Sequence, residues 1–163
     1  MQEVNLIQKI KDAGLRGRGG ASFPTGDKWQ AVFDAPGERK FVVCNASEGE
    51  PGPKKDYHIL QHYPERMIDG MQLAIKTMGA ERAYIYINPV YYKEFKGKLE
   101  KLIGDKPIVI FKKNHSAGYV GGAETSAPNH IEGHRIEPRL RPPYPVTNGL
   151  WGYPTLVNNV ETF

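Results

Sequence analysis

The sequence predicts an α/β fold, a three-layer domain with a mostly parallel sheet and a proline-rich C-terminal wrapping segment. Three short apolar runs, at residues 41–44, 84–87 and 108–111, alternate with segments whose apolar residues recur at helical spacing. The order strand, helix, strand, helix, strand favours right-handed crossovers and a parallel sheet that is covered by helices.

The helices are indicated by an apolar face and by glycines at their ends. Apolar residues fall at helical spacing within residues 4–10, and the glycine-rich stretch 14–24, here called the glycine loop, ends that helix. Residues 67–78 follow a period of about 3.6 and stop at Gly79, a favourable C-cap. A further amphipathic helix is predicted between the second and third strands; Phe95, Leu99 and Leu102 mark its apolar face, and it ends at Gly104.

The last part of the chain has a different character. From residue 115 onward the periodicity fades, while prolines accumulate and three aromatic residues, Tyr144, Trp151 and Tyr153, indicate that the segment packs on something. We predict a wrapping segment without another strand–helix unit. A chain of 163 residues has the length of one domain, so residues 1–163 are expected to form a single unit.

Composition limits the function classes. With 22 Lys and Arg against 18 Asp and Glu, the net charge of +4 is too small to indicate nucleic-acid binding. No apolar run approaches the roughly 20 residues that span a bilayer, so we expect a cytoplasmic protein, at most peripheral on a membrane complex. Cys44 is the single cysteine, which excludes an internal disulfide and a cysteine-only zinc or iron–sulfur site. The oligomeric state is left open, with a homo-oligomer as one option.

Polar loops at the strand ends are the predicted place for a site. In an open parallel sheet, ligands bind beyond the carboxyl ends of the strands. The loops 45–50 and 118–125 follow the first and third strands and are expected to face one pocket. In the glycine loop, bare backbone amides together with Arg18, and Lys28 beyond the loop, could hold a phosphate; a tight, basic surface loop is the alternative.

Other candidates have weaker support. For the glutamates of these loops, Glu48, Glu50 and Glu124, a solvated loop face is the alternative to a role in a site. The histidine pairs 58/62 and 130/134 have the i, i+4 spacing that can hold a metal ion, but neither has the HExxH form. We therefore favour surface histidines and predict no metal site.

Five blocks of sequence, in this order, carry a family resemblance. The chain resembles the flavin-binding part of the NADH-oxidising subunit of respiratory complex I, the 51-kilodalton or F-type subunit, whose relatives occur in NAD-linked hydrogenases and formate dehydrogenases. The blocks are GLRGRGGASFPTGDKW (14–29), NASEGEPGPKKD (45–56), GYVGGAETS (118–126), IEGHRIEPRLRPPYP (131–145) and GLWGYPTLVNNVET (149–162).

The resemblance implies a Rossmann-like domain that holds FMN in a deep cavity, with NADH stacking on the flavin. It implies FMN contacts from Gly17, Arg18, Gly19, Lys28, Asn45, Ser47, Tyr119, Asn158, Asn159 and Thr162. It implies NADH contacts from Phe23, Glu50, Glu124, Arg141 and Tyr144, with Glu50 and Glu124 on the nicotinamide side. The flavin carries the redox chemistry, so no catalytic acid or base and no metal is expected.

Two departures from the family pattern bear on activity. Ser47 stands where the family usually has an aspartate, and Ala123 stands where it usually has a glutamate. The resemblance also stops short of the family's ubiquitin-like and iron–sulfur domains. We therefore expect no iron–sulfur cluster in this chain and electron transfer to a partner iron–sulfur protein. A non-catalytic flavin- or nucleotide-binding subunit with an assembly role is the alternative, and an unrelated phosphate-binding protein is a third option.

Overall fold

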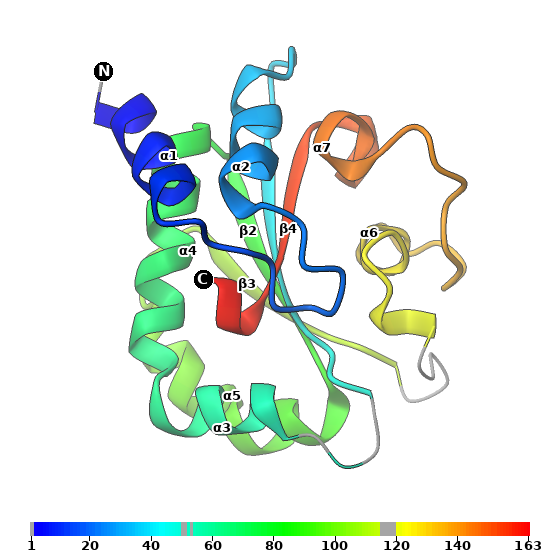
Figure 1. Ribbon diagram of the computed structural model, residues 1–163. Coiled ribbons are helices and arrows are strands. Elements are labelled where there is room, and N and C mark those ends of the chain that lie inside the picture. Colours follow the sequence, from blue (N-terminus) through cyan, green and yellow to red (C-terminus); the bar gives the residue numbers. More distant parts are fainter. Residues whose placement is uncertain (1, 50–51, 53, 115–119) are drawn as a thin grey trace.

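A computed structural model describes residues 2–49, 52, 54–114 and 120–163, and it contains a four-stranded parallel sheet between two helical layers (Figure 1). The strands are β1 (Phe41–Ala46), β2 (Arg82–Ile87), β3 (Ile108–Lys112) and β4 (Thr155–Asn159). They lie in the order β3-β2-β1-β4, and every neighbouring pair is parallel. The predicted α/β class with a parallel sheet is confirmed.

The helices form the outer layers of the fold. One face of the sheet carries the larger layer, α1 (Gln2–Asp12), α2 (Thr25–Asp34), α3 (Lys55–His62), α4 (Pro64–Met78) and α5 (Pro89–Ile103) (Figure 1). The other side has shorter pieces, α6 (Ser126–Ile131) and the 3-10 turn η3 (Leu150–Gly152), whereas α7 (Pro145–Asn148) lies beside β4 and α2, with Val146 packed against the larger layer's core. Two further 3-10 turns, η2 (Val120–Gly122) and η4 (Val160–Thr162), precede α6 and follow β4.

The central strand β1 separates two apolar cores. Val42, Cys44 and Ala46 belong to the core beneath α1, α2, α4 and α5, whereas Phe41 and Val43 belong to the core on the α6 side. All five side chains are buried, which explains why β1 is a continuous apolar run rather than an alternating pattern. Because both faces are covered, polar groups of β1 can reach solvent only at the strand's end.

Residues at the ends of α4 and α5 explain where these helices begin or stop. Asn88 caps α5, since its side-chain oxygen accepts a hydrogen bond from the Val90 amide. Gly79 ends α4 with a φ of 62°, a left-handed conformation that glycine adopts without strain. Both helices end where the glycines place them, but α5 begins at Pro89, six residues before the first apolar residue that marked it.

The prediction of a tail without a further strand was wrong. β4 lies in this tail and pairs with β1 along its length, from Phe41 opposite Thr155 to Asn45 opposite Asn159. The strand has five residues, follows Pro154 and ends in two asparagines, so it lacks a long apolar run. Its partner is more than 100 residues earlier in the chain, and no local crossover pattern marks the pairing. The helices α2 and α3 were also not predicted.

No helix in the described ranges has both the length and the apolar character that crossing a membrane requires.

Candidate functional site

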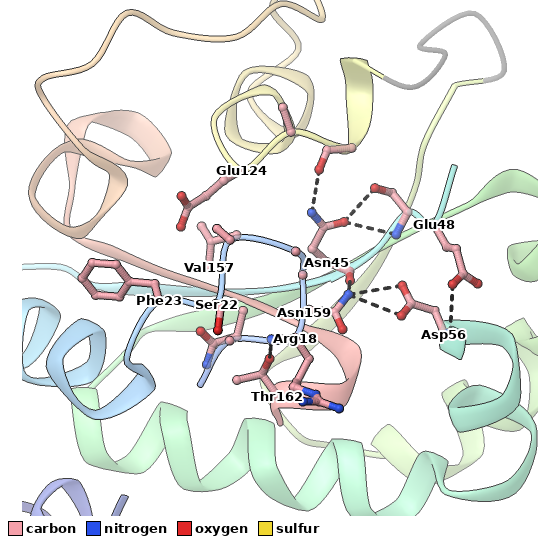
Figure 2. A pocket seen from close by; sticks show the side chains of 18 of the residues that line it. Arg18, Ser22, Phe23, Asn45, Glu48, Asp56, Glu124, Val157, Asn159 and Thr162 are labelled. Carbon is pink, nitrogen blue, oxygen red and sulfur yellow. Dashed lines mark hydrogen bonds between the residues drawn. The ribbon is translucent and has the colours of Figure 1, made fainter. Parts of the chain in front are cut away.

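A cavity of about 530 Å³ opens at the carboxyl ends of β1 and β4 (Figure 2). Its volume is in the range of small-molecule sites, roughly 300–1,000 Å³. Its walls come from segments that are far apart in the sequence. They are residues 17–23 and Lys28, residues 45–49 without Ala46, Lys55 and Asp56, residues 122–124, Arg141, and residues 157–159 with Thr162.

The structure brings most of the predicted site residues to this cavity. The lining includes Gly17, Arg18, Gly19, Phe23, Lys28, Asn45, Ser47, Glu124, Arg141, Asn158, Asn159 and Thr162. Tyr144 does not line it; this side chain is 52% exposed and precedes α7. Glu50 and Tyr119 lie outside the described residues.

The glycine loop forms a narrow turn that presents its backbone to the cavity. The Gly17 amide donates to the Phe23 carbonyl at 2.8 Å, and the Thr25 amide donates to the Leu15 carbonyl at 2.9 Å. The Gly19 amide makes no hydrogen bond to another residue within the described part of the chain. A bare amide beside a cavity is a donor that an anionic ligand can use.

The loop is tied to the tail. The Arg18 amide donates to the Thr162 hydroxyl at 3.0 Å, and the Arg18 guanidinium donates to Glu161 at 2.8 Å. A Cβ atom on Gly19 would lie 3.5 Å from the Cβ of Asn159, so these two backbones are close neighbours. The conformation of the glycine loop therefore depends on residues beyond β4.

Asn45 organises the end of β1. Its amide nitrogen donates to the Gly122 carbonyl at 2.8 Å, and its amide oxygen accepts from the Ser47 amide and hydroxyl at 3.2 and 2.7 Å (Figure 2). A side chain on Gly122 would bring a Cβ within 3.1 Å of the Ser47 hydroxyl. Glycine at this position allows η2 to approach the strand end.

One side of the cavity is built around an ion pair. The Lys28 ammonium lies 2.7 Å from a Glu124 carboxylate oxygen and donates to the Val157 carbonyl at 3.1 Å. The same ammonium lies 5.8 Å from the centre of the Phe23 ring, and Arg141 approaches Glu124 at 3.9 Å. Figure 2 shows Phe23 and Glu124 together on this side, away from Asp56.

The opposite side contains two residues that sequence reasoning missed, Lys55 and Asp56. Asp56 is 2% exposed, and burial raises the pKa of its carboxyl, an effect that the neighbouring Lys55 opposes. The Lys55 ammonium lies 2.7 Å from Asp56 and 2.6 Å from the amide oxygen of Asn159. Asn159 in turn donates from its amide nitrogen to Asp56 and to the Asn45 carbonyl. The sole sequence signal was the pair of lysines before an aspartate at the end of the second family block.

Glu48 connects the loop after β1 to two helices. One carboxylate oxygen accepts from the Lys55 and Asp56 amides at 3.0 and 3.3 Å, at the first turn of α3, and the other accepts from the Tyr91 hydroxyl at 2.9 Å. Burial and this carboxylate raise the pKa of Tyr91. A carboxylate at a helix N-terminus satisfies amides that have no partner within the helix. Glu48 therefore joins the β1 loop to α3 and α5.

By its chemistry, the cavity suits a ligand that carries anionic and hydrogen-bonding groups. Its lining combines a free glycine amide, four cationic and three acidic side chains, and hydroxyl and amide groups at the strand ends. Among the described residues no group of three or more His, Cys, Asp or Glu side chains could hold a metal ion.

Comparisons with known proteins identify the family of the chain. Residues 10–163 match the family described as the Nuo51 FMN-binding domain. The chain is 42% identical over 176 residues to the F subunit of the NADH-quinone oxidoreductase of Aquifex aeolicus (strain VF5), covering 99% of this chain and 41% of the relative. It is 39% identical over 178 residues to the alpha subunit of the NAD-reducing hydrogenase HoxS of Cupriavidus necator, covering 100% of this chain and 30% of the relative.

The fold is also that of a solved protein. A crystal structure of an NAD⁺-reducing nickel–iron hydrogenase in the H₂-reduced state superposes with a TM-score of 0.88 at 40% identity. The superposition covers 98% of this chain and 29% of the hydrogenase chain. The chain thus spans less than half the length of these relatives.

Proposed function

Because the chain belongs to the family of Nuo51 FMN-binding domains, we propose that its cavity binds FMN and that this module oxidises NADH. The observation that carries the proposal is the meeting, at one cavity, of the glycine loop, the end of β1 and the end of β4. These segments contribute the family-like blocks, and they come together at the strand ends, where parallel sheets bind cofactors.

The cavity fits the flavin. The free Gly19 amide and the cations beside it suit a phosphate, and Asn45, Ser47 and Asn158 offer polar groups at the strand ends. The absence of a side chain at Gly122 lets η2 approach Ser47 at the edge of the cavity. We assign FMN contacts to Gly17, Arg18, Gly19, Lys28, Asn45, Ser47, Asn158, Asn159 and Thr162, and also to Tyr119.

The Glu124 side of the cavity is assigned to NADH. Phe23 offers a half-exposed aromatic surface for a base, and Glu124 offers a carboxylate that can accept from ribose hydroxyls. Arg141, which is half exposed, can pair with the pyrophosphate. Glu50 and Tyr144 complete the proposed set, with Glu50 on the nicotinamide side.

When bound, FMN supplies the ring that accepts hydride and releases electrons singly. The chain positions the two cofactors and keeps cationic groups beside their phosphates. The proposed electron acceptor is a partner iron–sulfur protein. This proposal is supported by the named relatives, which are subunits of an NADH-quinone oxidoreductase and of a hydrogenase.

A second candidate function is flavin binding without NADH turnover. The observation that favours it is Ala123, which lines the cavity next to Glu124 but can neither donate nor accept a hydrogen bond through its side chain. In this case the chain would bind FMN as a structural part of an assembly.

One experiment separates these functions. The purified chain is loaded with FMN, and NADH is added without oxygen while the flavin absorbance is followed. Bleaching supports NADH oxidation, whereas a yellow protein that NADH does not bleach supports the second function. Failure to retain FMN at micromolar concentration contradicts both.

A further inference from the structure

Two cations from separate segments converge on one carboxylate at the glycine-loop side of the cavity. The Arg18 guanidinium lies 2.8 Å from one oxygen of Glu161, and the Lys55 ammonium lies 3.4 Å from the other. Arg18 belongs to the glycine loop, Lys55 begins α3, and Glu161 lies in η4. The two cations line the cavity, whereas Glu161 is not part of the lining.

The Lys55 ammonium has one weak contact among three. An ammonium carries three protons. Two acceptors are close, Asp56 at 2.7 Å and the Asn159 amide oxygen at 2.6 Å, while Glu161 is the most distant at 3.4 Å. The Lys55 side chain is 37% exposed, so a ligand in the cavity can reach the third proton.

Bare backbone lies next to this ammonium. Asn159, which accepts from Lys55, is also the residue against which Gly19 packs. The free Gly19 amide, the Arg18 guanidinium and the Lys55 ammonium therefore surround one end of the cavity. Backbone amides combined with two cations are the usual means of binding a phosphate group.

The Lys28 ammonium, unlike that of Lys55, is paired on the other side of the cavity. Its ammonium is 2.7 Å from Glu124 and donates to the Val157 carbonyl, and its side chain is only 18% exposed. It lies with Phe23 and Glu124, on the side that Figure 2 shows away from Asp56. Charge at the glycine-loop side therefore comes from Arg18 and Lys55.

We propose that Lys55, together with Arg18, recognises the phosphate monoester of the flavin, and that Glu161 holds these two cations when no phosphate is bound. The inference rests on the proposed FMN site and makes Lys55 the residue that distinguishes FMN from riboflavin. A phosphate dianion forms shorter, charge-assisted bonds with both cations than a single carboxylate at 3.4 Å can form with Lys55. Ligand binding then replaces the Lys55–Glu161 contact.

The test compares two ligands that differ by the phosphate alone. Dissociation constants for FMN and riboflavin are measured by flavin fluorescence on the full chain and on single variants. Lys55→Gln should weaken FMN binding by about tenfold or more and change riboflavin binding by less than about twofold, since one charge-assisted contact is lost from the phosphate. Lys55→Arg should retain most of the preference for FMN.

Matched lysine controls locate the effect. Lys54→Gln removes the neighbouring exposed charge outside the cavity and should leave both constants unchanged. Lys28→Gln should change both constants by the same factor, because Lys28 lies on the Glu124 side. Melting temperatures of all variants show whether each one is folded.

A second variant is expected to strengthen FMN binding instead of weakening it. Glu161→Gln removes the carboxylate that competes for both cations, so FMN should bind more tightly and riboflavin should not. Inorganic phosphate should compete with FMN on the unmodified chain and lose this effect in Lys55→Gln.

Three results would overturn the inference. Equal weakening of FMN and riboflavin by Lys55→Gln would make Lys55 a structural support while the proposed function stands. A changed ligand ratio in Lys28→Gln, with none in Lys55→Gln, would place the phosphate beside Glu124. Weaker FMN binding by a folded Glu161→Gln would contradict the competing role of that carboxylate. An unmodified chain that binds neither flavin would contradict the proposed function itself.

Discussion

Asp56 links the pH of the solution to the stability of the cavity wall. Burial raises the pKa of its carboxyl above the ordinary value of 3.8, so the folded protein holds this proton at a pH where the unfolded chain has released it. When the folded state binds more protons, the free energy of unfolding falls as the pH rises. The loss of unfolding free energy that Asp56 causes is complete once the pH exceeds the pKa of its carboxyl in the folded protein.

The variant Asp56→Asn should remove this pH dependence. Above about pH 4, the free energy of unfolding of the unmodified chain should fall relative to that of the variant as the pH rises, by at most about 1.4 kcal/mol per pH unit for one proton, until the folded carboxyl is also deprotonated. Urea denaturation at several pH values measures both curves. Parallel curves across this range would show that Asp56 titrates normally in the folded protein.

At the level of single residues, sequence alone identified the side chains that stand at strand ends or beside glycines. Arg18 and Asn45 fall into this group, whereas Asn158 was expected only from the family resemblance. Lys55 and Asp56 were missed because consecutive charged residues usually form a solvated face. The burial of Asp56 arises when the first turn of α3 packs against Asn159, more than 100 residues later. Sequence spacing contains no information about that contact.

At the scale of the elements, two helical glycines have opposite surroundings. In α2, a Cβ on Gly26 would overlap the Lys11 side chain and lie 2.9 Å from the Lys11 backbone nitrogen, so α1 approaches α2 closely. In α5, a Cβ on Gly97 would meet no atom within 4 Å. The same substitution should therefore have opposite effects at these positions.

Gly97→Ala should stabilise the protein by about 0.5–1 kcal/mol, because alanine costs less conformational entropy in a helix than glycine. Gly26→Ala should destabilise it by about 1–3 kcal/mol, because the backbone of α1 must move to accommodate the added methyl group. Urea denaturation of the two variants and of the unmodified chain measures both changes in the free energy of unfolding. A stabilised Gly26→Ala would contradict the close approach of α1 and α2.

The elements differ in how far their own residues specify them. α4 and α5 have an apolar period, a proline in the first turn and a glycine at the end, and both were predicted. α2 and α3 lack a side-chain cap from the residue that precedes them, and α3 receives its cap from Glu48 in another segment. β4 depends on pairing with β1. Among these missed elements, β4 is the one whose partner is distant in the sequence.

At the scale of the whole molecule, ligand binding and folding are linked. A ligand that binds only the folded state at 100 times its dissociation constant adds about 2.7 kcal/mol to the free energy of unfolding. For a chain of this size, each kcal/mol raises the melting temperature by roughly 2–4 °C. If the cavity binds FMN as proposed, saturation should therefore raise the melting temperature by about 5–10 °C.

Circular dichroism melts with and without FMN measure this shift, with adenine as a ligand that has no phosphate or flavin ring. Lys55→Gln should show a smaller shift than the unmodified chain at the same FMN concentration. An FMN-loaded chain that melts at the temperature of the free chain would show that the flavin does not stabilise the fold.

The position of β4 beside β1 also determines when the cavity can exist during synthesis. Domains emerge from the ribosome with the N-terminal part first. β1 and the glycine loop leave early, but β1 acquires its second neighbour only after Thr155–Asn159 has emerged, and Asn159 bonds to the Asn45 carbonyl across 114 residues. Until then the exposed edge of β1 is available to wrong pairing. If the cavity binds FMN as proposed, binding can occur only late in synthesis, after β4 has closed the sheet.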